Sequence, residues 1–424
     1  MIKIIEAENF SYTHIKDTAP DVSAAVREII EDVKANGDSA VKKYEKKFDG
    51  VELISLEVSQ AEKDEALKAV GDDFIKILER AAKNIFDFHS KQVRSGFAFS
   101  NRDGVILGQR IIPLERVGLY IPGGTASYPS SVLMNAIPAK IAGCKEIFIA
   151  TPPACRQRWP KIKNEIIAAA EVAGVNKIFK MGGAQAVAAF AYGTESVPGV
   201  DKISGPGNIF VAEAKRQVFG QVSIDMIAGP SEILIIADEN NNPAYIAADM
   251  LAQAEHDKLA SAVLITASKN FAESVANEIE AQIKNLIRHD IARASIDTNG
   301  KIILVKNFDE AVKISNEIAP EHLELCVENP FEWLTEGRIK NAGSVFLGRH
   351  SPEALGDYYA GPNHTLPTMG TARFSSPLSV DDFVKKSQYI YYTQDALKKV
   401  SDDIAKFAGS EGLTGHANSV LIRK

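Results

Sequence analysis

The chain has 424 residues, more than one ordinary hydrophobic core accommodates, which predicts two or three domains. With 45% hydrophobic residues, 24% charged residues and a net charge of −7, the composition is that of a soluble globular protein and excludes the basic surface of a nucleic-acid-binding protein. No apolar run reaches the roughly 18 residues of a membrane-spanning helix, and the N-terminus lacks the pattern of a signal peptide. We therefore expect a cytoplasmic protein with neither nucleic-acid nor membrane partners.

The N-terminal hundred residues or so are predicted to be mainly helical. Asp21, directly after Pro20, is a suitable N-cap for a first helix. Apolar residues recur on one face of this segment until Gly37, near which we expect the helix to end.

From about residue 105, short β-rich segments alternate with amphipathic segments of helical length. The β-rich segments are 117–121, 146–150, 177–181, 232–237, 262–267, 302–305, 323–327 and 344–347. Helical patterns lie between them, for example at 162–173 and 244–256. This alternation is typical of parallel sheets built from βαβ units. Because there are more strands than one mononucleotide-binding unit uses, we predict an α/β fold with two Rossmann-like lobes and helical extensions at both ends.

Turns rich in glycine and proline mark the candidate domain boundaries at 122–124, 229–231 and 375–377. We assign 1–118 and 233–375 to a first α/β domain with a helical N-terminus. Residues 119–232 would form a second, inserted α/β domain. Residues 376–424 would form a helical C-terminal tail that ends in a loop.

Three glycine clusters, at 120–124, 181–185 and 204–208, follow β-rich segments of the second domain. A glycine turn between a strand and a helix lets backbone N–H groups approach a phosphate. None of the clusters matches G-x-G-x-x-G, and each by itself is typical of an ordinary turn. Three at one end of a lobe predict a pocket for a phosphorylated ligand, without showing that this ligand is a dinucleotide.

The histidines separate into two groups. Four have no partner pattern and are interpreted as ordinary residues: His14, His89, His289 and His350. Gln253 and His256 are three residues apart on one predicted helix face, a spacing used by metal ligands but also common without a metal. Glu321 and His322 follow a proline and open a β-rich segment, where they could move protons for one substrate or lie in a plain turn.

Two polar stretches contain the remaining candidates. The segment 356–364 is predicted to be a long loop, and it carries Asp357 and His364. Glu411 and His416 lie near the C-terminus, where side chains more often have no functional role. A set of Gln, His, Asp and His would suit zinc without any thiolate, but the sequence does not show that these segments converge.

A set of segments, in this order, closely resembles the histidinol dehydrogenase family. They are 116–124 (RVGLYIPGG), 182–186 (GGAQA), 205–208 (GPGN), 228–232 (AGPSE), 253–256 (QAEH), 320–323 (PEHL), 356–358 (GDY), 361–368 (GPNHTLPT) and 411–416 (EGLTGH). Each is weak alone, but together they are highly specific and span about residues 110–420. The stretch 155–163 looks like a small insertion, which we expect at the surface.

The resemblance implies a two-step oxidation of L-histidinol through L-histidinal to L-histidine, the last step of histidine biosynthesis, with two NAD and one zinc ion per site. It implies an intertwined homodimer in which the tail reaches the partner subunit and supplies the last zinc ligand. The implied zinc ligands are Gln253, His256, Asp357 and His416, and the implied catalytic pair is Glu321 and His322. The implied substrate contacts are Ser130, Ser231, Gln253, His256, Glu321, His322, Asp357, His364, Glu411 and His416. The implied NAD contacts are Tyr120, Gln185 and Asn208, which would make 119–232 the NAD-binding domain.

In the mechanism that we expect from this resemblance, His322 is the base in both oxidations, Glu321 activates water and zinc positions the substrate. Three alternatives are left open: a zinc hydrolase with the same ligands, a non-catalytic metabolite-binding protein, and a relative that oxidises another amino or sulfonated alcohol. The cysteines Cys144, Cys155 and Cys326 form no closely spaced pair, which favours a reducing compartment. We expect Cys144 to be a small packing residue and the reaction not to use a thiohemiacetal.

Overall fold

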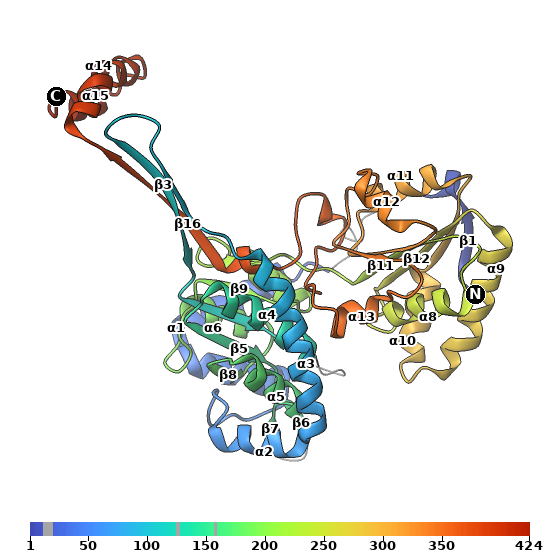
Figure 1. Ribbon diagram of the computed structural model, residues 1–424. Helices are drawn as coiled ribbons and strands as arrows, with labels where there is room; N and C mark the ends of the chain where they lie inside the picture. The colour runs from blue at the N-terminus through green and yellow to red at the C-terminus, as the bar shows by residue number, and fades with distance from the viewer. Residues whose placement is uncertain (12–19, 124–127, 157–158) are drawn as a thin grey trace.

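The computed structural model describes residues 1–11, 20–123, 128–156 and 159–424, so Gly124 and His14 lie outside the described residues. In these ranges most strands belong to two parallel sheets, one of six strands and one of five. Helices lie around each sheet, and a long arm projects away from both (Figure 1). The predicted α/β class with two parallel-sheet lobes is therefore confirmed.

The six-stranded sheet, here the first sheet, has the order β1-β13-β12-β11-β14-β15. Its strands are β1 (Lys3–Glu6), β11 (Glu232–Ala237), β12 (Ser261–Thr266), β13 (Lys301–Leu304), β14 (His322–Cys326) and β15 (Ser344–Leu347). All six residues of β11 are buried, as expected for a parallel strand covered on both faces. One face packs on α8 (Pro243–Ala254), α9 (Lys269–Gln282) and α10 (His289–Thr298). The other packs on α11 (Phe308–Ile318) and α12 (Pro330–Thr335).

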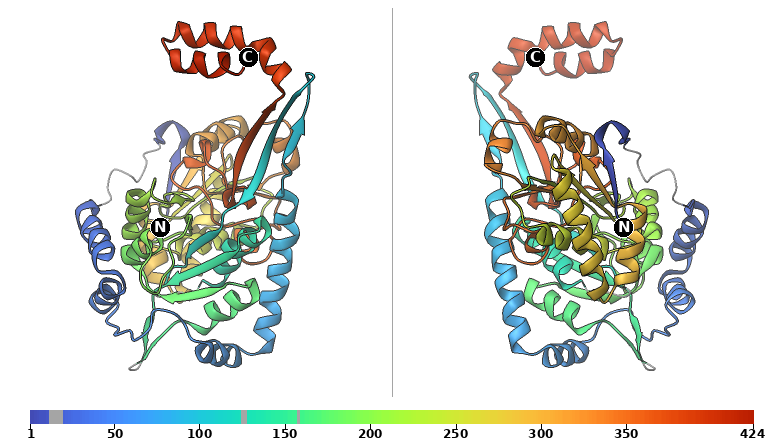
Figure 2. Two further views of the ribbon diagram at one scale, coloured as in Figure 1. Left: turned by 90° about the vertical axis from the view of Figure 1, so that its left-hand side faces the viewer. Right: turned by 90° about the vertical axis from the view of Figure 1, so that its right-hand side faces the viewer.

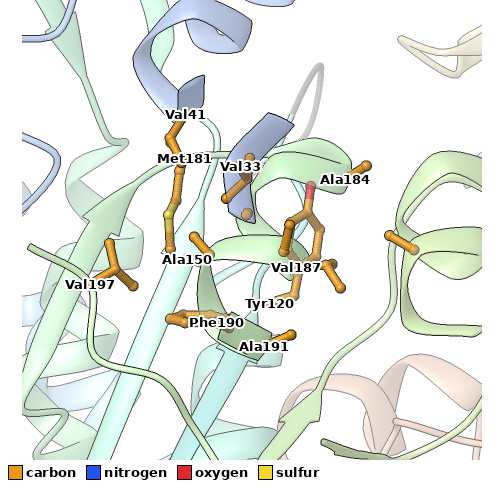
Figure 3. Close-up of a cluster of buried hydrophobic side chains, with 14 of the residues drawn as sticks. Val33, Val41, Tyr120, Ala150, Met181, Ala184, Val187, Phe190, Ala191 and Val197 are labelled. Carbon is orange, nitrogen blue, oxygen red and sulfur yellow. The ribbon is translucent and has the colours of Figure 1, made fainter. Parts of the chain in front are cut away.

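The five-stranded sheet, here the second sheet, has the order β10-β9-β4-β5-β8. Its strands are β4 (Arg116–Tyr120), β5 (Glu146–Thr151), β8 (Lys177–Lys180), β9 (Lys202–Ser204) and β10 (Ser223–Ile224). One face packs on α1 (Ser23–Phe48), α6 (Gly183–Tyr192) and α7 (Ile209–Val218), and part of this core is drawn in Figure 3. The other face packs on α2 (Gln60–Val70), α3 (Asp72–His89), α4 (Pro129–Ala142) and α5 (Asn164–Ala173). The strands that the sequence predicted in both sheets are present.

The N-terminal helices lie on the second sheet, which corrects the assignment of 1–118 to the first domain. Val26, Ile29 and Val33 of α1 share a core with α6 and α7, whereas only β1 joins the first sheet. The residues of β4 up to 118 also belong to the second sheet. The apolar face of a helix predicts that it packs on something, but not which sheet it packs on.

The first helical segment of α1 ends at Gly37, as expected from the sequence. Gly37 has φ 51° and lies outside helical geometry, and a second helical segment follows it to Phe48 under the same label. The carboxylate of Glu195 accepts a hydrogen bond of 2.7 Å from the Asp38 N–H directly after this break. What the sequence did not indicate is that a second helical segment starts immediately after the glycine.

The arm is made of an antiparallel ribbon with helices at its far end (Figures 1 and 2). Strand β3 (Val105–Pro113) pairs along its whole length with β16 (Val384–Tyr392), and the short β2 (Phe97–Phe99) pairs with β3. Helices α14 (Gln394–Ser410) and α15 (Thr414–Leu421) follow. The prediction of a helical tail that ends in a loop is thus wrong in two respects, because the segment 376–424 contains strand β16 before its helices and has the helix α15 close to its end.

The stretch 155–163 contributes to an antiparallel pair of strands, β6 (Ala154–Arg156) and β7 (Trp159–Lys161). It lies at the edge of the second sheet's helices (Figure 1). In the described ranges, no helix combines the length and apolar character needed to cross a membrane.

Candidate active site

The predicted catalytic pair lies at the amino ends of neighbouring strands in the first sheet. His322 is the first residue of β14, and it is level with Ile233 in β11. The αL residue Ala319 ends α11 just before Pro320, which leaves Glu321 and His322 at the strand entrance. Ligands of open α/β sheets usually lie at the carboxyl ends of strands, so this location could not be read from the strand pattern.

His322 has one ring nitrogen held by the backbone and the other free. Its Nδ1 lies 3.1 Å from the carbonyl oxygen of Glu232, which can only accept, so Nδ1 carries the proton. Its Nε2 is buried and has no hydrogen-bond partner among the residues that the structure describes. Burial lowers the pKa of His322 to about 4 and keeps the ring neutral. A neutral imidazole with a free Nε2 is suited to accept a proton.

Glu321 lies beside this ring and is also buried. Its Oε2 accepts a hydrogen bond of 2.9 Å from the backbone N–H of Glu232 and lies 3.7 Å from His322 Nδ1. Burial raises the pKa of Glu321 well above its usual range, and the neighbouring carboxyls of Glu232 and Asp357 act in the same direction. The structure thus brings the two predicted proton-transfer groups together.

Three of the predicted metal ligands also converge here. Gln253 lies in the last turn of α8 and is fully buried, and His256 follows directly after the helix. Asp357 lies in α13 (Glu353–Tyr358), a short helix where we expected a loop. Ligand atoms of His256, Asp357 and Glu353 all lie within 4.8 Å of one another.

Glu353 was not found from the sequence. It precedes Asp357 by four residues, so the two carboxylates lie on one face of α13. The amide of Gln253 donates to both Glu353 oxygens, over 3.0 and 3.2 Å, when its nitrogen is turned toward them. Its oxygen then takes the position away from Glu353. Oxygen and imidazole donors of this kind fit zinc, so the residues present are suited to the metal that the resemblance implies.

His364, another predicted substrate contact, also belongs to this site. Its Nδ1 lies 3.1 Å from the carbonyl oxygen of Asp357, and its Nε2 lies 3.2 Å from the hydroxyl of Ser131. The predicted substrate contact Ser130 is the neighbouring half-buried residue in the first turn of α4, and Ser231 immediately precedes β11. His322, Asp357 and His364 line one cavity of about 190 Å³.

Glu411 and His416 are not brought to this site within the chain. Both are exposed, Glu411 at the end of α14 and His416 in α15. These helices lie at the tip of the arm, beyond the length of the β3–β16 ribbon (Figure 1).

The predicted NAD contacts lie together at the carboxyl edge of the second sheet. Tyr120 ends β4, Gln185 is in the first turn of α6, and Asn208 is the N-cap of α7. The Tyr120 hydroxyl accepts a hydrogen bond of 3.1 Å from the Gly183 N–H, and Figure 3 shows Tyr120 beside Ala184 and Val187 of α6. The side-chain oxygen of Asn208 accepts from the N–H groups of the helix that it caps, which leaves its amide nitrogen for a ligand.

Glu45 is a second residue that the sequence did not indicate. It belongs to α1, is fully buried, and accepts hydrogen bonds from Gly182 N–H over 2.8 Å and from Gln185 Nε2 over 2.9 Å. A carboxyl group of the chain itself therefore occupies the N-terminus of α6, where a dinucleotide phosphate binds in many related folds. This agrees with the lack of the usual glycine fingerprint before α6.

Cys144 and Cys326 are packing residues. The thiol of Cys144 donates to the carbonyl of Phe383 over 3.7 Å, and burial raises its pKa to about 12. The thiol of Cys326 donates to the carbonyl of Gly348 over 3.8 Å. Neither of these two lines the cavity that contains His322.

The sequence is closely similar to those of known proteins. The family model described as histidinol dehydrogenase matches residues 13–424. The chain is 54% identical over 403 residues to the histidinol dehydrogenase of Clostridium acetobutylicum, covering 95% of this chain and 92% of that protein. It is 54% identical over 423 residues to that of Listeria monocytogenes, covering 100% and 96%.

A solved structure gives the same result. The crystal structure of histidinol dehydrogenase from Elizabethkingia anophelis superposes with a TM-score of 0.91 at 37% identity, over 100% of this chain and 98% of that one. Both the sequence matches and the structural match extend over nearly the whole length, including the arm. The chain therefore belongs to the histidinol dehydrogenase family.

Proposed function

We propose that this protein oxidises L-histidinol through L-histidinal to L-histidine, with NAD as the hydride acceptor and zinc in the site. One observation carries this proposal. The free Nε2 of the neutral His322 lies 3.9 Å from Asp357 Oδ1, within the group of side chains suited to a metal. A base beside a metal-held substrate is what the oxidation of a polar alcohol requires.

Gln253, His256 and Asp357 would hold the zinc ion, together with the partner subunit's His416. When bound, zinc would position the amine and imidazole nitrogens of the substrate rather than the reacting hydroxyl. Glu353 would keep the oxygen of Gln253 directed toward the ion through its contact with the amide nitrogen. NAD would bind at Tyr120, Gln185 and Asn208.

In the first oxidation, His322 Nε2 would accept the hydroxyl proton while the carbon of the same alcohol transfers a hydride to NAD. Glu321 would then accept a proton from water as the water oxygen adds to the aldehyde carbon, and the protonated His322 would return its proton to the aldehyde oxygen. Burial makes Glu321 a stronger base than an exposed carboxylate once it is ionised. His322 would accept the hydrate proton while a second NAD takes the second hydride, and His364 would contact the carboxylate that forms.

We further propose a homodimer in which each arm brings Glu411 and His416 into the site of its partner. The arm exposes apolar side chains that are unusual on a free surface, because Ile390 is 75% and Phe407 is 70% exposed. Burial of these side chains against a second subunit would stabilise the pair. The free thiols of Cys144 and Cys326 favour a reducing compartment, and we place the enzyme in the cytoplasm.

The proposed activity is tested by counting NADH and histidine. Zinc-loaded protein is incubated with NAD and L-histidinol, NADH is followed by its absorbance, and L-histidine is measured by chromatography. We expect two NADH for each histidine. If the folded, metal-loaded protein forms no NADH, the proposal is rejected. The alternatives are then a dehydrogenase of another amino alcohol or a zinc hydrolase, and assays of the same protein with other substrates would distinguish them.

Two variants separate the roles of the catalytic pair. His322→Asn keeps a polar side chain but removes the imidazole base, and it should slow both oxidations by about 10²–10⁴-fold, the usual range for loss of a general base. Glu321→Gln should retain oxidation of the alcohol but lose turnover of the aldehyde in single-turnover experiments. Equal loss of both steps in Glu321→Gln would contradict its assignment to water activation.

A further inference from the structure

A series of buried and part-buried hydrogen bonds, linked through neighbouring residues of the chain, joins the cofactor side of the molecule to the substrate side. It begins at a buried ion pair between Lys215 and Asp225, whose side chains are 2% and 1% exposed. Lys215 Nζ donates to the carbonyl of Gly205 over 3.0 Å, and Asp225 accepts from the N–H of Gly205 over 2.7 Å. The backbone at the start of the loop 205–208, which ends in Asn208, is therefore held from both sides.

The series continues through one fully buried amide, Asn135 of α4. Its Oδ1 accepts a hydrogen bond of 2.7 Å from the hydroxyl of Ser204, directly before the loop. Its Nδ2 donates to the carbonyl of Ser131 over 2.9 Å and to the hydroxyl of Thr365 over 3.3 Å. One end of this amide thus contacts the cofactor loop, and the other end contacts the substrate side.

The last contacts of this series reach Asp357, one of the predicted zinc ligands. Ser131 contacts His364 Nε2 through its hydroxyl, and Thr365 is the residue after His364. His364 Nδ1 in turn contacts the backbone carbonyl of the predicted zinc ligand Asp357. Every polar group of Asn135 is used, and a buried polar group that loses its partner costs about 1–3 kcal/mol.

We infer that Asn135 is a positioning residue that couples the binding of NAD at the loop 205–208 to the binding of substrate beside His364. The inference rests on the proposed function, because that assigns the two ligands to these loops. If the loop 205–208 moves and Ser204 loses its contact with Asn135, the buried side-chain oxygen of Asn135 has no partner. Asn135 can follow the loop only if Ser131 and Thr365, to which its amide nitrogen donates, move with it. The two loops therefore adopt their ligand-binding positions together, and each ligand favours the binding of the other.

The test measures this coupling with ligands that do not react. The dissociation constant of L-histidine is measured by calorimetry on the zinc-loaded protein, without NAD and with saturating NAD. In the wild type we expect NAD to tighten L-histidine binding at least about fivefold, the lower end of usual coupling between sites. In Asn135→Ala the ratio should fall to about one, with zinc content retained.

A matched control removes a buried amide elsewhere. Asn241 donates to the carbonyls of Asp238 and Cys326 at the opposite edge of the first sheet, so Asn241→Ala should keep the wild-type ratio. If Asn135→Ala does not fold, Ser204→Ala removes the hydroxyl that donates to Asn135 over 2.7 Å and lies 3.3 Å from Asp225 Oδ2, and this variant should also lower the ratio.

The outcomes separate the inference from the proposed function. A wild-type ratio of about one, or an unchanged ratio in both Asn135→Ala and Ser204→Ala, would overturn the coupling even if the protein makes two NADH for each histidine. Failure of the wild type to oxidise L-histidinol would instead reject the proposed function.

Discussion

The chemistry of His322 is decided by its surroundings rather than by the histidine itself. The carbonyl of Glu232 fixes the proton on Nδ1, and burial keeps the ring neutral. A histidine on an exposed turn would have neither property, because water would satisfy both nitrogens. The adjacent Glu321 is held by the N–H of the same residue, so Glu232 orients both groups through its backbone.

Glu353 should control zinc affinity through Gln253. Glu353→Gln keeps an oxygen that accepts from the Gln253 amide but loses the negative charge beside the ion. Removal of such a supporting contact typically weakens metal binding by about 10–100-fold. The measurement is competition for zinc with a chromogenic chelator, together with the shift in Tm on zinc addition.

The control for this variant is Glu332→Gln, an exposed glutamate in α12, which should bind zinc like the wild type. Equal zinc affinity in Glu353→Gln and Glu332→Gln would show that Glu353 neither ligates nor supports the site.

Glu45 should make the stability of the fold depend on pH. Burial raises its pKa from 4.5 to about 8, so between these values the folded state holds a proton that the unfolded state has released. The free energy of unfolding therefore falls as the pH rises through this window. Glu45→Gln cannot titrate and still accepts from Gly182 and Gln185, so its Tm relative to the wild type should rise across the window.

The measurement is thermal unfolding of both proteins at several pH values between about 5 and 9, which spans the window. Glu28→Gln, at an exposed position on the same helix, is the matched control. A Tm difference between Glu45→Gln and the wild type that stays constant with pH would contradict the buried-carboxyl explanation.

At the scale of elements, the site lies between strand ends of the two sheets, and glycine-rich loops follow the strands of the second sheet. The second sheet offers its carboxyl edge, whereas the first sheet offers its amino edge with His322 and the end of α8. Close approach of the loops depends on Gly205, whose φ is 113° and whose added Cβ would lie 2.1 Å from the carbonyl oxygen of Tyr120.

Gly205→Ala should therefore be more costly than a change at another glycine with positive φ. Gly220 has φ 104° but nothing within 4 Å of an added Cβ. Gly220→Ala should destabilise by about 1–3 kcal/mol through backbone strain alone. Gly205→Ala should cost a further 1–3 kcal/mol, roughly, because the methyl group overlaps backbone atoms. Chemical denaturation of both variants measures the difference, and equal losses would show that the Tyr120 contact relaxes freely.

At the scale of the whole molecule, the arm separates two of the predicted site residues from the rest. Glu411 and His416 lie in the helices at its tip (Figure 1), and residues 385–391 of β16 are exposed. In the homodimer that we propose, the arm would reach a second copy of the chain.

Mixed dimers should test whether sites are shared. His416→Ala and His256→Ala should each be inactive alone. In a purified heterodimer of the two, one site keeps both histidines and the other loses both, so activity should return to about half of the wild type. Differently tagged chains allow the heterodimer to be isolated, and two wild-type chains carrying the same tags are the control. An inactive but well-formed heterodimer would place all ligands of a site in one chain.

Much of the fold follows from the order of apolar residues. A segment such as 232–237 is buried on both faces and is therefore apolar almost throughout, a pattern that by itself predicts a parallel strand. Gln253 and His256 were found from helical spacing, and the pair Glu321–His322 from the proline before it. The segments shared with the family added Asp357, His364 and His416, which spacing alone could not connect.

The tertiary structure decided what depends on contacts between distant segments. Glu45, Asn135 and Glu353 occur in helices whose sequences look ordinary, because a buried polar side chain is recognisable only by its partner. Helices α1 to α3 pack on a sheet whose strands come later in the chain, so their own sequence does not show which sheet this is. In the same way, β16 is a strand because it pairs with the distant β3. The sequence by itself determined eight strands of the two parallel sheets, the family and most of the chemical groups, because these are local patterns. Only the fold decided that the groups meet at the amino edge of one sheet, facing a cofactor loop of the other, because packing alone sets those distances.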